Sequence, residues 1–291
     1  MARILDTTRD CTPQIACLKS SGFDTVVRYY SKSAWKRIGQ AEARALADND
    51  ISIVAVYQNR QNQAADFDKP QGERAGEHAY DYASNVIFQP AGSAIYFSVD
   101  FDASEAEVNQ RVIPFFAGIR SAFQHMDGGG PARYRIGVYG SGRVCRLLSA
   151  DDHVELMWLA QATGWAEFRR YLNAKKWHLK QELPAVVCGM DCDPDVDNPE
   201  LPDFGAFTPD VELLGPSTPV TPAAAVDSYT VNARDGLRMR AGPGTTFDIR
   251  RLLPFGMPLR VLSRNGDWAL VDLNSDGAAD GFCFAEYLKA A

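Results

Sequence analysis

Short apolar runs recur along residues 1–207, and each run ends in polar or aromatic side chains. Runs of this length that contain β-branched and aromatic residues predict β-strands. The runs are Arg3–Asp6, Thr25–Tyr30, Ile51–Gln58, Ile95–Asp102, Arg135–Tyr139, Leu156–Gln161 and Val186–Asp191. We therefore expect a series of short strands along this part of the chain.

The segments between these runs predict helices. Thr12–Pro13 supplies a cap and a proline in the first turn, and Gln40–Asn49 is rich in alanine and other helix formers. Ser104 and Glu107 have the spacing of a capping box, which opens a helix that runs to about Met126. Pro114 predicts a kink within that helix.

Alternation of strands and helices is typical of parallel strands joined by helical crossovers, so the fold class is α/β. About eight strand candidates within residues 1–207 favour a closed, TIM-like (β/α) barrel. An open doubly wound sheet is the alternative. In both folds the ligand site lies at the carboxyl ends of the strands.

Polar and aromatic side chains gather at those predicted strand ends. They are Asp6, Arg28, Tyr30, Gln58, Asp100, Asp102, Tyr139, Gln161 and Asp191. Aromatic rings can stack on the apolar faces of a sugar, while amides and carboxylates can bind its hydroxyl groups. The set therefore indicates a saccharide site.

Asp100 and Asp102 are the most informative pair in this set. If the strand continues through both, their side chains point the same way, roughly 6 to 7 Å apart. Two acids on one face of a buried strand repel each other, so one of them is expected to retain its proton and serve as a general acid. The alternative is a strand end that runs into solvent and a helix cap.

Charge and composition exclude several classes of protein. The net charge of −7 leaves no basic face for nucleic acid, and no apolar stretch approaches the ~20 residues of a membrane span. Met1 leads directly into a predicted strand without the regions of a secretory signal. We therefore expect synthesis in the cytoplasm without a signal peptide, and any export by cell lysis or specialised secretion.

The cysteines and histidines give no metal motif. Cys11 and Cys17 could pair, and Cys188 lies close to Cys192 in the sequence, but neither spacing is diagnostic. The four histidines are scattered, and paired Cys-x-x-Cys motifs are missing from the sequence. We expect no metal and no cofactor.

A second domain follows a change in composition. Residues 208–225 carry four prolines among Ser, Thr and Ala, which predicts an extended linker between a domain at 1–207 and one at 226–291. Residues 226–291 contain short apolar runs separated by Gly, Pro, Asn and Asp turns. This pattern predicts a small all-β barrel.

The second segment resembles the bacterial SH3 family of wall-targeting domains. The matching residues are Leu237–Gly244, Gly256, Gly266–Val271, Gly281–Phe282 and Tyr287–Leu288. The resemblance implies an SH3-like barrel that binds the stem peptide or cross-bridge of peptidoglycan. A generic interaction module is the alternative.

The first segment resembles a glycoside-hydrolase-like domain of unknown function that is related in fold to family 25 lysozymes. The matching pieces are Ile4–Asp6, Val27–Tyr30, Ile95–Asp102, Gly137–Ser141, Trp158–Ala162 and Gly189–Asp193. The resemblance implies a modified (β/α) barrel with a peptidoglycan glycan strand as its ligand.

Carried over by position, Asp6 matches the acid of the first strand, Asp100 the first acid of the lysozyme Asp-x-Glu motif, and Asp191 the acid of the last strand. Asp102 stands where those lysozymes have a glutamate, so its carboxyl group is set back by roughly 1.5 Å. Because proton transfer needs heavy atoms within about 3 Å, this departure either abolishes activity or redirects the substrate.

These residues lead to a mechanistic hypothesis of β-1,4 glycosidic hydrolysis in peptidoglycan by a lysozyme-like (muramidase) enzyme. Asp102 would protonate the departing oxygen, Asp100 would stabilise positive charge or orient the N-acetyl group, and Asp6 and Asp191 would tune the acid. The expected substrate-binding residues are Arg28, Tyr30, Gln58, Tyr139, Gln161 and Asp193.

Two other functions stay open, a catalytically silent glycan-binding protein and a hydrolase of another polysaccharide. The biological setting is equally open, because a phage lysin, an antibacterial toxin with an immunity protein as partner, and a host remodelling enzyme would share these features.

Overall fold

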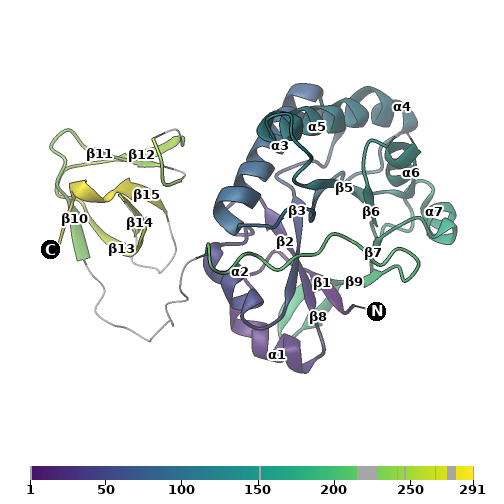
Figure 1. Ribbon diagram of the computed structural model, residues 1–291, viewed down its shortest axis with the longest axis horizontal. Helices are drawn as coiled ribbons and strands as arrows, with labels where there is room; N and C mark the ends of the chain where they lie inside the picture. Colours follow the sequence, from purple (N-terminus) through teal and green to yellow (C-terminus); the bar gives the residue numbers. More distant parts are fainter. Residues whose placement is uncertain are drawn as a thin grey trace. The chain divides into compact units, whose positions relative to one another are not determined.

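The computed structural model describes residues 2–150, 152–214, 228–240, 242–245, 247–265, 267–273 and 280–290. The chain divides into two compact units, residues 1–217 and 218–291 (Figure 1). Each unit has its own core and is described by itself.

The first unit is built on a closed barrel of eight strands. Its strands are β1 (Ile4–Asp6), β2 (Thr25–Tyr30), β3 (Ser52–Tyr57), β4 (Ala94–Ser98), β5 (Arg135–Gly140), β6 (Leu156–Leu159), β7 (Leu179–Gln181) and β9 (Met190–Asp197). They follow one another in this order around the barrel, and β9 pairs with β1 to close it. The α/β barrel prediction is confirmed, and the open doubly wound sheet is wrong.

The last strand departs from the expected all-parallel arrangement. Strands β1 to β7 are parallel to their neighbours, whereas β9 runs antiparallel to both β7 and β1. It forms a hairpin with β8 (Ala185–Val187), so the single strand expected at Val186–Asp191 is a turn between two strands. The start of β9 therefore lies at the carboxyl ends of its neighbours.

Helices surround the barrel (Figure 1). The α-helices are α1 (Ile15–Ser20), α2 (Gln40–Ala47), α3 (Lys69–Tyr82), α4 (Glu105–Glu107), α5 (Ile113–Met126), α6 (Gly142–Ala150) and α7 (Phe168–Ala174). Single turns at Thr12–Gln14, Ala64–Asp66, Ala83–Ile87 and Val108–Val112 complete the set. None of the helices among the described residues has the length and apolar character needed to cross a membrane.

The capping box that the sequence predicts at the start of α4 is confirmed. Ser104 and Glu107 form the capping box that opens α4, with the Ser104 Oγ accepting from the Glu107 amide at 3.2 Å. The helix continues through the wide turn Val108–Val112, directly before Pro114 in the first turn of α5. Because proline has no N–H group, one backbone hydrogen bond of a regular α-helix is missing at Pro114. The widened turn is the local adjustment to that missing bond.

Helices α3 and α5 cross in close contact because glycines stand at the crossing. A Cβ atom on Gly72 would lie 1.9 Å from the Phe115 carbonyl oxygen, and one on Gly118 would lie 2.2 Å from that of Lys69. Any larger residue at either position would push the helices apart. The crossing holds α3 against the outer face of the barrel.

The side chains of the strands form two separate layers. Successive strand residues point to opposite faces, so one set fills the barrel and the other packs under the helices. The interior set contains Ile4, Val27, Val54, Val56, Tyr96, Trp158 and Leu179. The outer set includes Leu5, Val26, Tyr30, Ile53 and Phe97. This division decides which polar residues can meet at the mouth of the barrel.

The described residues of the second unit form an antiparallel sheet of seven strands. They are β10 (Ser228–Val231), β11 (Leu237–Arg240), β12 (Ile249–Leu253), β13 (Pro258–Asn265), β14 (Trp268–Asp272), β15 (Gly281–Phe284) and β16 (Leu288–Ala290), with a turn at Ala285–Tyr287. Its core contains Val231, Leu237, Met239, Leu253, Leu259, Val271 and Cys283. The prediction of a second, all-β, SH3-like unit is confirmed.

Residues 208–214, the first part of the expected linker, belong to the first unit. Leu214 packs against the outer core, and Arg44 donates to the Val211 carbonyl oxygen at 2.8 Å. Residues 215–225 of the expected linker lie outside the described residues.

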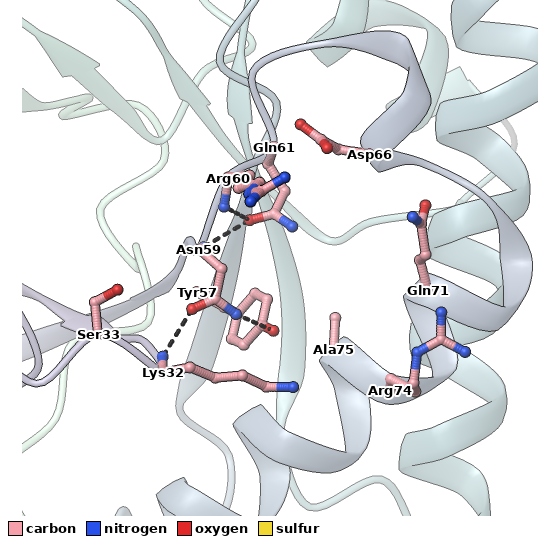
Figure 2. Close-up of a pocket in the computed structure, with 10 residues that line it drawn as sticks. All are labelled: Lys32, Ser33, Tyr57, Asn59, Arg60, Gln61, Asp66, Gln71, Arg74 and Ala75. Atoms are coloured by element: carbon pink, nitrogen blue, oxygen red, sulfur yellow. Dashed lines mark hydrogen bonds between the residues drawn. The ribbon is translucent and has the colours of Figure 1, made fainter.

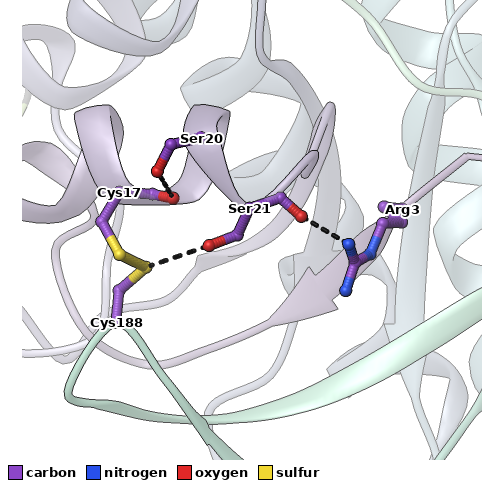
Figure 3. The surroundings of a disulfide bond; sticks show 5 residues. All are labelled: Arg3, Cys17, Ser20, Ser21 and Cys188. Carbon is purple, nitrogen blue, oxygen red and sulfur yellow. Dashed lines mark hydrogen bonds between the residues drawn. A yellow bond between two sulfur atoms is a disulfide. The ribbon is translucent and has the colours of Figure 1, made fainter.

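A disulfide joins the start of the first unit to its end. Cys17 on α1 pairs with Cys188 in the β8–β9 turn, with 5.9 Å between their Cα atoms (Figure 3). Cys11 and Cys192 are buried free thiols, so both pairings considered from sequence proximity are wrong. The bond ties the hairpin that leads into β9 to the helix that follows β1.

The double substitution Cys17→Ser/Cys188→Ser should lower the free energy of unfolding of the first unit by about 2–5 kcal/mol, because the cross-link closes a long loop. Urea unfolding of the oxidised protein measures the difference. Reductant should bring the wild type to the level of the variant and leave the variant unchanged. Equal stability of oxidised wild type and variant would contradict the role of the bond.

Candidate active site

Asp6 lies at the carboxyl end of β1 and points into the barrel. Its side chain is only 4% exposed. The Tyr29 hydroxyl donates to its Oδ1 at 3.2 Å, and the Gln181 Nε2 donates to its Oδ2 at 2.8 Å. Both carboxyl oxygens therefore have fixed partners, one from β2 and one from β7.

Asp193 faces Asp6 across the antiparallel pairing of β9 with β1, where the two residues are in register. The Gln181 Nε2 also donates to the Asp193 Oδ2, at 3.1 Å. The Gln181 Oε1 accepts from the Tyr139 hydroxyl at 3.0 Å and from the Gln161 amide at 3.3 Å. One amide side chain thus connects two acids to the strands on the other side.

Asp100 lies two residues beyond the end of β4 and is half-buried. The Gln58 Nε2 donates to its Oδ2 at 3.1 Å. Lys36 donates to the Gln58 Oε1 at 3.4 Å, and its Nζ lies 4.9 Å from the centre of the Tyr29 ring. Gln58 therefore links the Lys36 ammonium group to the Asp100 carboxylate.

These residues form one group at the mouth of the barrel, which we call the carboxylate network. Its members are Asp6, Asp100, Asp193, Tyr29, Lys36, Gln58, Tyr139 and Gln181. They come from seven strands or the loops that follow them, so only the closed barrel brings them together.

Burial raises the pKa values of the acids in the network. The pKa of Asp6 rises to about 7 because burial outweighs the hydrogen bonds from Gln181 and Tyr29, and the charges of Asp193 and Asp100 add to the rise. Burial also raises the pKa of Asp100, against the opposing effects of Gln58 and Lys36, and that of Asp193. At neutral pH the network can hold a proton on one acid beside others that accept one.

Asp195 lies deeper in the barrel on the same face of β9. The Trp158 Nε1 donates to its Oδ1 at 2.8 Å, and the side chain is 4% exposed. Burial, together with the charge of Asp6, raises its pKa well above the ordinary value. A neutral Asp195 avoids a buried negative charge beneath the network.

Asp102 lies apart from the network. Strand β4 ends at Ser98, so Asp100 and Asp102 do not share a strand face, and that expectation is wrong. The Asp102 side chain is exposed, and its Oδ1 accepts from the Ala166 amide at 2.9 Å, in the segment between β6 and α7.

Asp191 is exposed at the start of β9, where its carbonyl oxygen accepts from the Thr7 hydroxyl at 2.9 Å. The acid opposite Asp6 is Asp193, two residues later. Because β9 runs antiparallel to β1, residues later in the strand lie deeper in the barrel. The acid that approaches Asp6 therefore comes from within the strand.

Arg28 and Tyr30 do not line the mouth of the barrel, which corrects their expected placement. They belong to the outward face of β2. Arg28 is 1% exposed and forms two hydrogen bonds with Glu42 of α2, at 2.7 and 3.0 Å. Tyr30 is fully buried, and its hydroxyl donates to Gln89 at 2.8 Å. Tyr29, on the inward face between them, joins the network.

The other expected binding residues are brought together. Gln58, Tyr139 and Asp193 belong to the network by their side chains, and Gln161 contributes its amide. The side-chain oxygen of Gln161 and the hydroxyl of Ser98 are buried and accept from no donor among the described residues.

Three members of the network, Tyr29, Lys36 and Gln181, were missed by sequence reasoning. Side chains alternate between two faces within Thr25–Tyr30, and the sequence did not show whether Tyr29 or the pair Arg28 and Tyr30 points into the barrel. Gln181 ends β7, whose three residues are too few for an apolar run to mark them. Lys36 lies in a loop without a motif.

Family models match both units. The model of the Rv2525c-like, glycoside hydrolase-like domain matches residues 16–191, and that of the bacterial SH3 domain matches residues 235–289. The first match spans more than half of the chain, so the protein belongs to the Rv2525c-like, glycoside hydrolase-like family. The two resemblances stated from the sequence are confirmed.

Individual relatives agree with this assignment. The uncharacterized protein YbfG of Bacillus subtilis (strain 168) is 31% identical over 179 residues, which cover 58% of this chain and 24% of YbfG. The chain thus spans about a quarter of the length of that curated relative. The Tat-secreted protein Rv2525c of Mycobacterium tuberculosis, solved with L-tartrate, has a TM-score of 0.58 at 22% identity, covering 70% of this chain and 98% of that one. This likeness shows the fold of the first unit.

A family 25 glycosyl hydrolase from Bacillus anthracis is also among the similar structures. Its TM-score is 0.42 at 9% identity, and the match covers 68% of this chain and 88% of that chain.

Replacing Arg28 with Met should cost about 3–5 kcal/mol of unfolding free energy, because the Glu42 carboxylate would remain buried without its partner. Glu42→Met should also destabilise, because the Arg28 guanidinium would remain buried without its partner. The double variant Arg28→Met/Glu42→Met should be more stable than the sum of the single changes predicts. Urea unfolding measures all three. A stable Arg28→Met protein with impaired ligand binding would instead restore Arg28 to the site.

The raised pKa of Asp6 predicts a pH dependence of stability. Between its ordinary value of 3.8 and about 7, the folded protein retains a proton that the unfolded chain has released. The contribution of Asp6 to the free energy of unfolding should therefore fall as the pH rises through this range and stay constant above it. Comparison of wild type with Asp6→Asn at successive pH values measures this contribution. A difference that is independent of pH would contradict the raised pKa.

Proposed function

We propose that the protein hydrolyses β-1,4 bonds of peptidoglycan glycan strands and that its carboxylate network performs the chemistry. The observation that carries the proposal is the set of three acids with raised pKa values at the carboxyl end of a closed barrel. Glycoside hydrolysis requires one carboxylic acid that donates a proton and a second carboxylate that supports the sugar cation.

Asp100 suits the role of general acid. It is half-buried and so accessible to a ligand, burial raises its pKa, and Gln58 fixes one of its oxygens. It would protonate the departing glycosidic oxygen as the bond to the anomeric carbon breaks. The resulting carboxylate would then accept a proton from the water that adds to that carbon.

Asp193 and Asp6 suit supporting roles. Asp193 is half-buried and can place its carboxylate near positive charge on the sugar, or orient an N-acetyl group that acts as internal nucleophile. Asp6 is a positioning residue, because its contacts run through Tyr29 and Gln181. Tyr29 and Tyr139 support the acids through their hydroxyl groups, which donate to Asp6 and to Gln181.

The second unit supports the choice of a wall polymer as substrate. A bacterial SH3 domain on the same chain as a glycoside hydrolase-like barrel would hold the barrel on its substrate by binding the stem peptide or cross-bridge. The disulfide supports action outside the cytoplasm, since such bonds persist in oxidising compartments. We therefore propose the cell wall as the place of action.

A catalytically silent glycan-binding protein is the second candidate. The observation that favours it is Asp102, which stands in place of a lysozyme glutamate and is exposed and bound to the Ala166 amide. A barrel in which the acid at this sequence position lies outside the carboxylate network could bind a glycan without hydrolysing it.

Asp100→Asn should lower the release of reducing ends from purified peptidoglycan by about 10²-fold or more, the usual effect of losing a general acid. The matched change Asp102→Asn should retain most of the wild-type rate, because that side chain lies apart from the network. Equal loss in both variants would contradict the assignment of Asp100. Wall binding without release by the wild type would select the silent binder, and release from other glycans alone would select another polysaccharide.

A further inference from the structure

A polar pocket of about 440 Å³ lies beside the carboxylate network (Figure 2). It is formed by the loops that follow β2 and β3 and by the first turns of α3. Its lining residues are Lys32, Ser33, Tyr57, Asn59, Arg60, Gln61, Asp66, Gln71, Arg74 and Ala75. Nothing in the proposed reaction uses this pocket.

The pocket concentrates positive charge in a chain whose net charge is −7. Lys32, Arg60 and Arg74 reach it from three different segments, and all three are exposed. Across the described parts of the chain, none of these three side chains takes part in an ion pair. The single acid in the lining, Asp66, accepts from the Asn62 amide at 3.2 Å. The pocket therefore offers several donors to an anion.

The wall of the pocket is held in place by hydrogen bonds. The Asn59 Nδ2 donates to the Tyr57 hydroxyl at 2.6 Å, and its Oδ1 accepts from the Lys32 amide at 2.7 Å. The Gln61 Oε1 accepts from the amides of Asn59 and Arg60, at 2.7 and 3.1 Å. Figure 2 shows the Lys32–Asn59 bond holding the loop after β3 against that after β2, and the Gln61 bonds closing the loop after β3 on itself. Such preorganisation lowers the entropy cost of binding a ligand.

The same loop connects the pocket to Asp100. Gln58, which binds the Asp100 carboxylate, directly precedes the pocket residue Asn59. The Asp100 amide donates to the Gln61 carbonyl oxygen at 2.8 Å. The loop that contacts Asp100 therefore also lines the pocket.

We propose that this pocket binds a carboxylate carried by the glycan, either the lactyl carboxylate of muramic acid or a carboxylate of the stem peptide attached to it. The inference rests on the proposed function and adds a charged recognition element to it. A single carboxylate fits better than a phosphate dianion, because Asp66 shares the lining.

The test compares ligands that differ only in charge. The full chain is titrated calorimetrically with the peptide-free muramyl disaccharide, with the same disaccharide carrying its stem peptide, and with both after amidation of their carboxylates. We expect the wild type to bind at least one acid form about tenfold more tightly than its amide, as charge-assisted hydrogen bonds predict. The form that is preferred identifies the lactyl or the peptide carboxylate.

Variants assign the preference to the pocket. Lys32→Gln and Arg74→Gln should each weaken binding of the preferred acid form several-fold and leave binding of its amide unchanged, which also shows that they remain folded. Lys176→Gln, which removes an exposed charge just after α7, should bind as the wild type does. Loss of affinity for acid and amide alike would overturn the proposal.

Equal affinity of the wild type for acid and amide forms would also overturn the proposal. So would a wild type that binds none of these forms. A wild type that prefers the acid form but releases no reducing ends would overturn hydrolysis alone and leave the pocket assignment standing.

Discussion

The pairing of β9 with β1 is the interaction on which the site depends. An eighth strand that enters the barrel antiparallel places Asp193 opposite Asp6 and Asp195 deeper on the same face. Three acids in one barrel would repel each other if all were ionised, so the structure compensates by hydrogen bonds and by proton uptake. Gln181 binds Asp6 and Asp193 together, and burial raises the pKa values of all three.

The outer layer holds this arrangement in place. The Arg28–Glu42 ion pair joins β2 to α2, and Tyr30 bonds to Gln89, so the strand that carries Tyr29 is fixed from behind. The Cys17–Cys188 disulfide fixes the turn that leads into β9. Buried polar contacts behind the strands thus position the polar contacts at the mouth, as expected for a site built on rigid elements.

Much of the fold followed from the sequence. Thr25–Tyr30 forms a strand over the expected residues, the Ser104–Glu107 capping box is present, and strand–helix alternation gave the closed barrel. The sequence did not show which face of each strand points into the barrel. Barrel strands are apolar on both faces, so the pattern marks a strand without showing which residues point inward. We therefore expected Arg28 and Tyr30 on the inward face, which Tyr29 occupies. Because β9 is antiparallel to β1, the acid opposite Asp6 is Asp193 and not Asp191.

The most direct test is a carboxyl ¹³C NMR titration of Asp6 in the wild type and in Asp193→Asn. We predict that Asp6 titrates near pH 7 in the wild type and at a lower pH in the variant, because the variant removes a negative neighbour across the strand pair. An Asp6 that titrates near its ordinary value of 3.8, or that does not respond to the change at Asp193, would contradict the coupled carboxylate network.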